Sequence, residues 1–128
     1  MNLNFKKISI IGLGLIGTSI LHAIKAKEED KVLTFAYDIN PEHRDIVLQM
    51  KIATFVCDDI QNAVSEADLV ILAVPVGAMK TVASLIAPFL KNNTIVTDTG
   101  STKGSVINDI NPYFSNKVYF IPSHPLAG

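Results

Sequence analysis

Short apolar runs rich in Val, Ile and Leu alternate along this chain with segments whose apolar residues recur at helical spacing. Such runs are typical of strands buried on both faces of a parallel sheet, and the segments between them are typical of amphipathic helices. The predicted strands cover residues 7–11, 32–37, 54–56, 69–74, 94–98 and 117–121. The predicted helices cover about residues 15–27, 42–51, 60–66, 76–90 and 103–110.

Strands that alternate with helices through short links pair in parallel, with right-handed crossovers. The pattern therefore predicts an α/β fold, a doubly wound Rossmann parallel sheet of about six strands with helices on both faces. No linker, repeat or low-complexity segment interrupts the 128 residues, and this length suits one unit with its own core. We predict a single domain over residues 1–128.

Composition narrows the functional classes. Eleven basic residues stand against twelve acidic ones, so no strong electrostatic field favours nucleic acid or anionic lipid. The one cysteine, Cys57, cannot form an internal disulfide, and no Cys/His spacing of the zinc-site kind occurs. We expect Cys57 to be a small core residue in a reduced, cytoplasmic protein that holds no metal.

The beginning of the chain also has a feature of signal peptides, because Lys6 and Lys7 precede an apolar stretch over residues 8–21. The stretch is shorter than the roughly 20 residues that span a bilayer. Three glycines interrupt it, and a strand, a turn and a helix start explain them better. We expect no membrane association.

A glycine-rich loop, Gly12-Leu13-Gly14-Leu15-Ile16-Gly17, directly follows the first predicted strand and opens the first predicted helix. In this context Gly12 permits a tight turn, Gly14 lets the backbone approach a pyrophosphate, and Gly17 allows close packing of helix on strand. Phosphates bind to the unpaired N–H groups at such a helix start. The loop, with Leu15 and Ile16 in the first turn, predicts a dinucleotide-binding domain.

Asp38 ends the second predicted strand about 20 positions beyond the last glycine of the loop. A carboxylate here accepts hydrogen bonds from ribose hydroxyls and repels a 2′-phosphate, so NAD is favoured over NADP. Two alternatives remain open: Asp38 caps the helix that follows Pro41, or Arg44 reaches a 2′-phosphate and permits NADP. Arg44 can equally be a solvated ion-pair partner of Glu42 or Asp45.

Ligands of a doubly wound sheet bind outside the carboxyl ends of its strands. The segments that follow the fourth, fifth and sixth predicted strands therefore share one crevice. They begin with Val74-Pro75, which we expect to contact the cofactor, and continue with residues 98–104 and 122–128. His22 and His43 fall on predicted helices that we place away from this edge, and we assign them no function.

Several motifs at this edge resemble those of the prephenate and arogenate dehydrogenases of tyrosine biosynthesis. The motifs at residues 98–104 and 123–128 are more specific than the glycine loop. The matching segments are Gly12-Leu13-Gly14-Leu15-Ile16-Gly17, Tyr37-Asp38, Ala67–Val76, Asp98–Gly104 and Ser123-His124-Pro125-Leu126-Ala127-Gly128. The resemblance spans the sequence and implies NAD-dependent oxidative decarboxylation of prephenate to 4-hydroxyphenylpyruvate, or of arogenate to tyrosine.

The resemblance implies two catalytic residues, His124 and Ser101. His124 corresponds to the histidine that takes a hydrogen bond from the ring hydroxyl of the substrate, and an imidazole suits that proton transfer at cellular pH. Ser101 corresponds to a serine that contacts the same hydroxyl. The alternatives are a solvent-exposed turn histidine and a serine that caps the following helix.

Members of this family continue into a mainly helical domain that forms the dimer and closes over the substrate, so we expect residues 1–128 to be the N-terminal part of a longer enzyme, without that domain. We expect the isolated chain to bind NAD without appreciable turnover. A β-hydroxyacid-type dehydrogenase domain and a non-catalytic NAD-binding or sensing module are the alternative functions. The sequence separates neither prephenate from arogenate nor enzymes that tyrosine inhibits from those that it does not.

Overall fold

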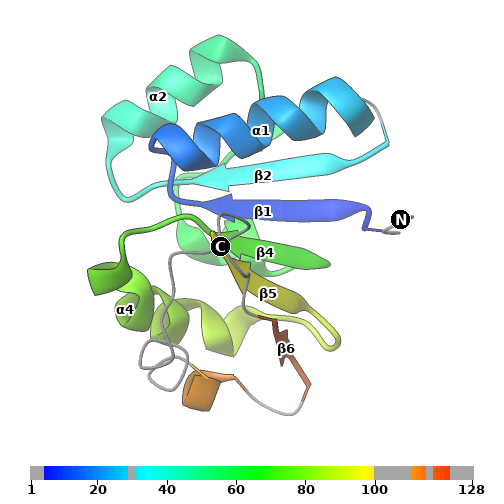
Figure 1. The fold of residues 1–128 in the computed structure, drawn as a ribbon, viewed down its shortest axis with the longest axis vertical. Helices are drawn as coiled ribbons and strands as arrows, with labels where there is room; N and C mark the ends of the chain where they lie inside the picture. Colours follow the sequence, from blue (N-terminus) through cyan, green and yellow to red (C-terminus); the bar gives the residue numbers. More distant parts are fainter. Residues whose placement is uncertain (1–4, 29–30, 100–110, 115–116, 122–128) are drawn as a thin grey trace, which may run out of the picture.

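Six parallel strands form one sheet in the computed structural model, which describes residues 5–28, 31–99, 111–114 and 117–121 (Figure 1). The strand order is β3-β2-β1-β4-β5-β6, so the chain starts in the middle of the sheet and winds outward in both directions. The strands are β1 (Lys7–Ile11), β2 (Leu33–Tyr37), β3 (Phe55–Val56), β4 (Leu69–Leu72), β5 (Ile95–Asp98) and β6 (Tyr119–Phe120). The predicted doubly wound Rossmann sheet is confirmed.

Helices connect the strands and cover the sheet. They are α1 (Leu15–Glu28), α2 (Pro41–Met50), α3 (Ile60–Val64) and α4 (Val76–Ile86), with 3₁₀ turns η1 (Ala87–Phe89) and η2 (Asn111–Tyr113). The predicted helix over 76–90 is too long, because Pro88 has no N–H to continue the α-helical pattern and η1 takes over at Ala87. The helix predicted over 103–110 lies outside the described residues.

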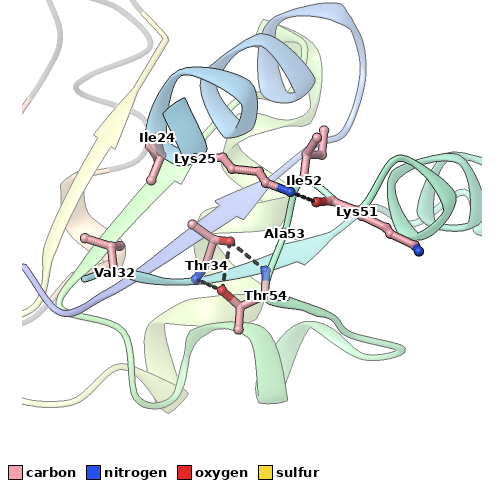
Figure 2. Close-up of a pocket in the computed structure, with 8 residues that line it drawn as sticks. All are labelled: Ile24, Lys25, Val32, Thr34, Lys51, Ile52, Ala53 and Thr54. Atoms are coloured by element: carbon pink, nitrogen blue, oxygen red, sulfur yellow. Dashed lines mark hydrogen bonds between the residues drawn. The ribbon is translucent and has the colours of Figure 1, made fainter. Parts of the chain in front are cut away.

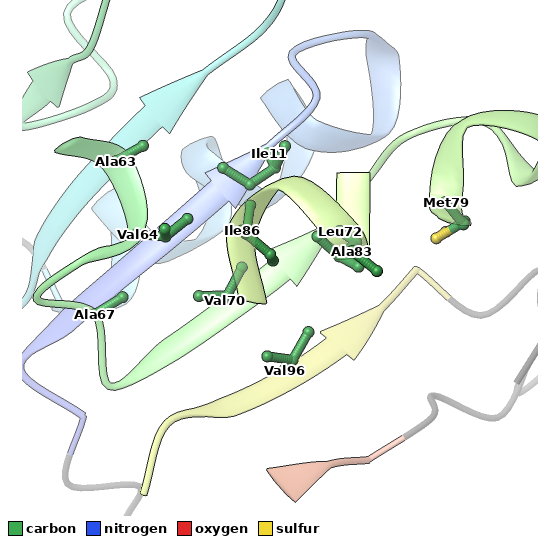
Figure 3. Close-up of a cluster of buried hydrophobic side chains, with 10 residues drawn as sticks. All are labelled: Ile11, Ala63, Val64, Ala67, Val70, Leu72, Met79, Ala83, Ile86 and Val96. Atoms are coloured by element: carbon green, nitrogen blue, oxygen red, sulfur yellow. The ribbon is translucent and has the colours of Figure 1, made fainter. Parts of the chain in front are cut away.

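One apolar cluster fills the space between the sheet and helices α3 and α4 (Figure 3). Each fully buried Val, Leu, Ile or Met side chain in it contributes about 1.5–3 kcal/mol relative to an exposed one. The cluster contains Ile11 of β1, Val70 and Leu72 of β4, Val96 of β5, Ala63 and Val64 of α3, Ala67, and Met79, Ala83 and Ile86 of α4. Cys57, expected in the core, is half-buried and packs against this cluster without belonging to its buried set.

A second apolar cluster covers the opposite face under α1 and α2. It joins Ile8 and Ile10 of β1 to Leu21 of α1 and Val47 of α2. Alternate residues of β1 thus feed the two clusters, since Ile11 belongs to the first. The sheet is covered on both faces, which is why its strands read as nearly continuous apolar runs.

The amino-terminal edge of β2 is closed by side chains that hydrogen-bond to backbone groups (Figure 2). Thr34 and Thr54 pair reciprocally, because each backbone N–H donates to the hydroxyl oxygen of the other, over 3.0 and 2.9 Å. Beside this pair, Lys25 of α1 donates to the carbonyl oxygen of Lys51, which ends α2 in a left-handed conformation (φ 57°). Figure 2 shows the ammonium group of Lys51 itself pointing away from the two threonines.

Candidate functional site

A cavity of about 960 Å³ lies at the carboxyl edge of the central strands. Its walls come from the loop after β1, the end of β2, the start of α2, residue Ile60 of α3, the loop after β4, helix α4 and Thr99. This volume lies within the roughly 300–1,000 Å³ range of small-molecule sites. Seven predicted cofactor residues line the cavity: Gly12, Gly14, Leu15, Ile16, Asp38, Val74 and Pro75.

The three glycines of the loop have different surroundings. Gly12 adopts a left-handed φ of 104°, and a Cβ there would collide with the backbone of Ala73 and lie 3.1 Å from Val74 Cγ1. A Cβ on Gly17 would overlap the carbonyl oxygen of Gly12, so Gly17 brings α1 against the loop rather than lining the cavity. A Cβ on Gly14 would meet nothing within 4 Å. Gly14 therefore leaves open space on the cavity side of the loop.

Helix α1 begins at this open space. Leu15 and Ile16 are 86% and 56% exposed, so the described chain leaves the side chains of the first two helical residues largely uncovered. The amides of a helix's first turn have no intrahelical acceptor, and α1 has no acidic residue in that turn to occupy them. The start of α1 is thus an electropositive rim of the cavity, and it suits an anion.

Asp38 stands at the other side of the glycine loop, directly after β2. Its Oδ2 accepts a hydrogen bond from the Leu13 amide over 2.7 Å, and its Oδ1 accepts one from the Asn40 amide over 2.8 Å. Burial raises the pKa of this carboxyl, but these two amides and His43 lower it by more, so the pKa lies below its ordinary value. Asp38 is therefore ionised, and its hydrogen bond with the Leu13 amide holds the glycine loop in place.

The helix-capping alternative for Asp38 is wrong. Asn40 is the N-cap of α2, since its side-chain oxygen accepts from the Glu42 amide over 2.9 Å, and Pro41 follows at the first helical position. The Asp38 carboxylate instead accepts a hydrogen bond from the amide of Asn40, so it supports the N-cap residue without being the cap itself. Its carboxylate lines the cavity.

The position expected for His43 is wrong too, because His43 lines the cavity. Its Nδ1 lies 3.2 Å from Asp38 Oδ2. The sequence could have indicated this contact: His43 stands three residues after the N-cap Asn40, and the first turn of a helix that starts at the carboxyl edge faces that edge. Counting helical spacing alone does not reveal it.

Arg44 is held beside the same carboxylate. Its Nη1 donates to the backbone carbonyl oxygen of Asp38 over 2.9 Å, and its guanidinium lies 5.8 Å from the centre of the Tyr37 ring. The structure shows no ion pair of Arg44 with Glu42 or Asp45 within the described residues. Arg44 therefore places a permanent positive charge next to the Asp38 backbone.

The far wall of the cavity is apolar. Ile60 of α3 and Ala78, Val82 and Leu85 of α4 contribute to it. Val74 and Pro75 connect β4 to α4, and the Ala73 amide donates to the Ile11 carbonyl over 2.7 Å, which keeps this connection close to the glycine loop. A flat ring system could pack between these apolar side chains and the loop.

The two predicted catalytic residues, Ser101 and His124, lie outside the described residues. The described chain reaches the cavity immediately before the first of them, because β5 ends at the buried Asp98 and Thr99 lines the cavity. In the described part of the chain, no three His, Cys, Asp or Glu side chains gather into a possible metal site. None of its helices is long and apolar enough to cross a bilayer.

Comparison with known proteins matches residues 21–128 to the family model described as prephenate dehydrogenase, nucleotide-binding domain. A cyclohexadienyl dehydrogenase of Zymomonas mobilis is 49% identical over 124 residues, which cover 97% of this chain and 42% of that protein. A prephenate dehydrogenase of Lactococcus lactis is 38% identical over 128 residues, covering 96% of this chain and 34% of that protein. The chain thus spans less than half the length of these relatives.

Solved structures agree with the fold. The prephenate dehydrogenase from Aquifex aeolicus, in complex with hydroxyphenyl propionate and NAD⁺, superposes with a TM-score of 0.84 at 26% identity, covering 100% of this chain and 44% of that one. An arogenate dehydrogenase from Synechocystis superposes with a TM-score of 0.81 at 22% identity, covering 93% and 40%. At that lower identity the likeness concerns the fold alone.

Proposed function

Because this chain belongs to the nucleotide-binding domain family of the prephenate dehydrogenases, we propose that it binds NAD in the cavity at the carboxyl edge of its sheet. The Aquifex aeolicus structure of the same family was solved with NAD⁺. In the assignment proposed here, the glycine loop and the start of α1 hold the pyrophosphate, and Asp38 holds the adenosine ribose. Val74 and Pro75 contact the cofactor farther along the cavity.

The observation that carries this proposal is the open space at Gly14 between the start of α1 and Asp38. Phosphate groups need a close approach to backbone amides, and a side chain at Gly14 would fill the space through which they approach. The ionised state of Asp38 suits a ribose diol, whose two hydroxyls are donors. The residues that the structure describes therefore fit the dinucleotide.

The reaction that we propose is oxidative decarboxylation of a substrate with a cyclohexadienyl ring, prephenate or arogenate. NAD supplies the hydride acceptor. His124 accepts the proton of the ring hydroxyl as hydride leaves the carbon that bears it, and Ser101 orients that hydroxyl. The ring carboxylate then leaves as carbon dioxide, its electron pair reaches the ring oxygen, and the proton returns there to give a phenol. We place this activity in the full-length enzyme, of which this chain supplies the cofactor half.

A valine at position 14 tests the cofactor site. We expect Gly14→Val to weaken NAD binding at least tenfold, because its side chain occupies the open space. The thermal unfolding midpoint should stay within a few degrees, because a Cβ at position 14 has no neighbour within 4 Å. Ser84→Val is the matched control, since Ser84 is exposed on α4 and does not line the cavity. Calorimetric titration with NAD reads out both variants. Undiminished binding by Gly14→Val would show that the cofactor lies elsewhere.

The reaction itself is tested in the full-length enzyme by following NADH formation with prephenate and with arogenate. We expect His124→Asn to reduce turnover by about 10²–10⁴-fold, the usual contribution of a general base, with NAD affinity preserved. A β-hydroxyacid-type dehydrogenase would turn over neither ring substrate. A sensing module would produce no NADH with either and would be indifferent to the substitution.

A further inference from the structure

The carboxylate of Asp38 is nearly saturated with hydrogen bonds. A carboxylate offers about four lone-pair positions. The amides of Leu13 and Asn40 take one on each oxygen, and His43 Nδ1, when it carries a hydrogen, takes a second on Oδ2. Counting the partners that the described residues supply, Oδ1 keeps one free position and Oδ2 keeps none. A ribose diol that binds through both hydroxyls must therefore share Oδ2 with His43 or displace it.

His43 is free to respond to its surroundings. Its side chain is 43% exposed and lies on the cavity side of α2, whereas the Asp38 side chain is 13% exposed. The Leu13 and Asn40 groups that bind Asp38 are backbone amides, so His43 is the partner among the described residues that can rotate away by turning its side chain. Histidine is also the side chain whose charge ordinarily changes between pH 5 and 8.

We propose that His43 sets the choice between NAD and NADP according to its charge, an inference that rests on the proposed cofactor site. With His43 neutral, Asp38 carries an uncompensated negative charge, which binds the ribose diol and repels a 2′-phosphate. With His43 protonated, the imidazolium neutralises Asp38, competes with the diol for Oδ2 and attracts the 2′-phosphate. Arg44, which does not line the cavity, places a permanent positive charge at the Asp38 backbone carbonyl. Acidic pH therefore moves the preference towards NADP.

Few other titratable groups face His43. Among the described residues that line the cavity, only Asp38, Tyr37 and His43 are titratable. The glycine loop, α1, α3, the loop after β4 and α4 contribute Gly, Leu, Ile, Ala, Val, Pro and Thr to the lining. Glu42 and Arg44 adjoin His43 on α2 itself, and Arg44 is held at the Asp38 carbonyl. Among these groups His43 is the only histidine, and the lowered pKa of Asp38 keeps that carboxyl ionised beside it.

The test measures dissociation constants of NAD and NADP at pH 5.5 and pH 8. For the unsubstituted chain we expect the ratio of the NADP constant to the NAD constant to fall at the lower pH. The 2′-phosphate itself gains a proton near pH 6, so part of this fall belongs to the ligand. His43→Asn keeps a hydrogen-bond donor without the titration and isolates the contribution of the protein. We expect the ratio of the two dissociation constants to fall about five times further in the unsubstituted chain than in His43→Asn. This is the size expected for one partly screened charge pair.

His22→Asn is the matched control, because His22 is an exposed histidine of α1 that does not line the cavity. It should retain the full pH dependence. A second measurement does not depend on any variant: NMR titration of the His43 ring should show a higher titration midpoint with NADP bound than with NAD bound, because coupling between proton and ligand is reciprocal.

Equal falls of the ratio in the unsubstituted chain and in His43→Asn would overturn the inference, as would identical titration midpoints of His43 with the two cofactors. Either result leaves the proposed function intact if NAD binds. Failure of the unsubstituted chain to bind NAD at all would instead overturn the proposed cofactor site.

Discussion

Two aspartates at opposite edges of the sheet have nearly the same hydrogen bonds and different surroundings. Asp68, at the amino-terminal edge, accepts from the Lys6 and Lys7 amides over 2.9 and 3.0 Å and from Lys91 Nζ over 2.6 Å. Asp38, at the carboxyl edge, also accepts from two amides and faces one basic side chain. Each carboxyl has a lowered pKa although burial raises it, because its partners outweigh the burial.

The difference lies in what the third partner can do. Lys91 forms an ion pair with Asp68 Oδ1 over 2.6 Å, and Asp68 joins three chain segments, so the pair acts as a clamp. His43 can lose its charge or rotate, and Asp38 lines an open cavity. Two carboxylates with similar hydrogen bonds thus differ in role, because Asp68 joins chain segments at the amino-terminal edge and Asp38 lines the cavity at the carboxyl edge. Position relative to the carboxyl ends of the strands separates the two.

The largest expected effect concerns the close contact between Gly17 of α1 and the carbonyl oxygen of Gly12, which holds the helix against the glycine loop. In Gly17→Ala the added methyl group would overlap the Gly12 carbonyl oxygen, and backbone on both sides prevents an easy adjustment. We expect a loss of at least about 3 kcal/mol in the free energy of unfolding, as for other severe steric substitutions. Urea unfolding followed by circular dichroism measures it. A loss below about 1 kcal/mol would mean that the loop and α1 can move apart freely.

The next prediction compares how much the loss of each aspartate side chain, Asp38 or Asp68, weakens NAD binding. We expect Asp38→Ala to weaken NAD binding about 100-fold, because two hydrogen bonds to a charged acceptor are lost at about 1.5 kcal/mol each. Asp68→Ala should leave NAD binding within about twofold, since Asp68 does not line the cavity. Calorimetry on both variants measures the contrast. Equal losses would show that Asp38 acts on the fold and not on the ligand.

The sequence predicts the framework of this site well and its details less well. Runs of β-branched residues, Gly12 after a strand and Pro41 after Asn40 are local signals, and the elements that they predict are present. Because parallel strands align their carboxyl ends, the sequence also predicts that Asp38 and the glycine loop share an edge. These inferences need only local propensity and the handedness of crossovers.

Other features depend on geometry that spacing along the chain does not contain. The place of His43 in the first turn after the N-cap Asn40 indicates which edge it faces, but its 3.2 Å contact with Asp38 Oδ2 depends on the direction in which α2 leaves the sheet. The hydrogen bond from the Leu13 amide to Asp38 depends on how closely the glycine loop passes the end of β2. The predicted strand over 69–74 ends early, at Leu72, and the chain bends at Val74, beside Gly12. Such contacts are tertiary, so residue type alone does not indicate them.

A smaller effect is expected on stability when the Asp68–Lys91 ion pair at the amino-terminal edge is weakened. Asp68→Asn should lower the free energy of unfolding by about 1–2 kcal/mol at pH 7, since hydrogen bonds to a charged group weaken. The folded-state pKa of Asp68 is lowered, so its contribution is present above the unfolded value of about 3.9 and is lost as the pH falls through the folded pKa. The stability difference between the two proteins should therefore shrink below about pH 4. Chemical unfolding at pH 7 and pH 3 tests this, and a constant difference would contradict it.

The smallest expected effect comes from Ser9 in the middle of β1, between the two edges. Its hydroxyl is fully buried and has no hydrogen-bond partner among the described residues, whereas the buried hydroxyl of Thr94 donates towards the carbonyl oxygens of Ala67 and Lys91. Removing an unpaired buried hydroxyl relieves its desolvation cost, so Ser9→Ala should stabilise the protein by about 0.5 kcal/mol. Thr94→Val, which deletes a paired hydroxyl, should destabilise it by about 1 kcal/mol. Urea midpoints of the two variants measure both shifts, and destabilisation of equal size by both would show that Ser9 is paired in solution.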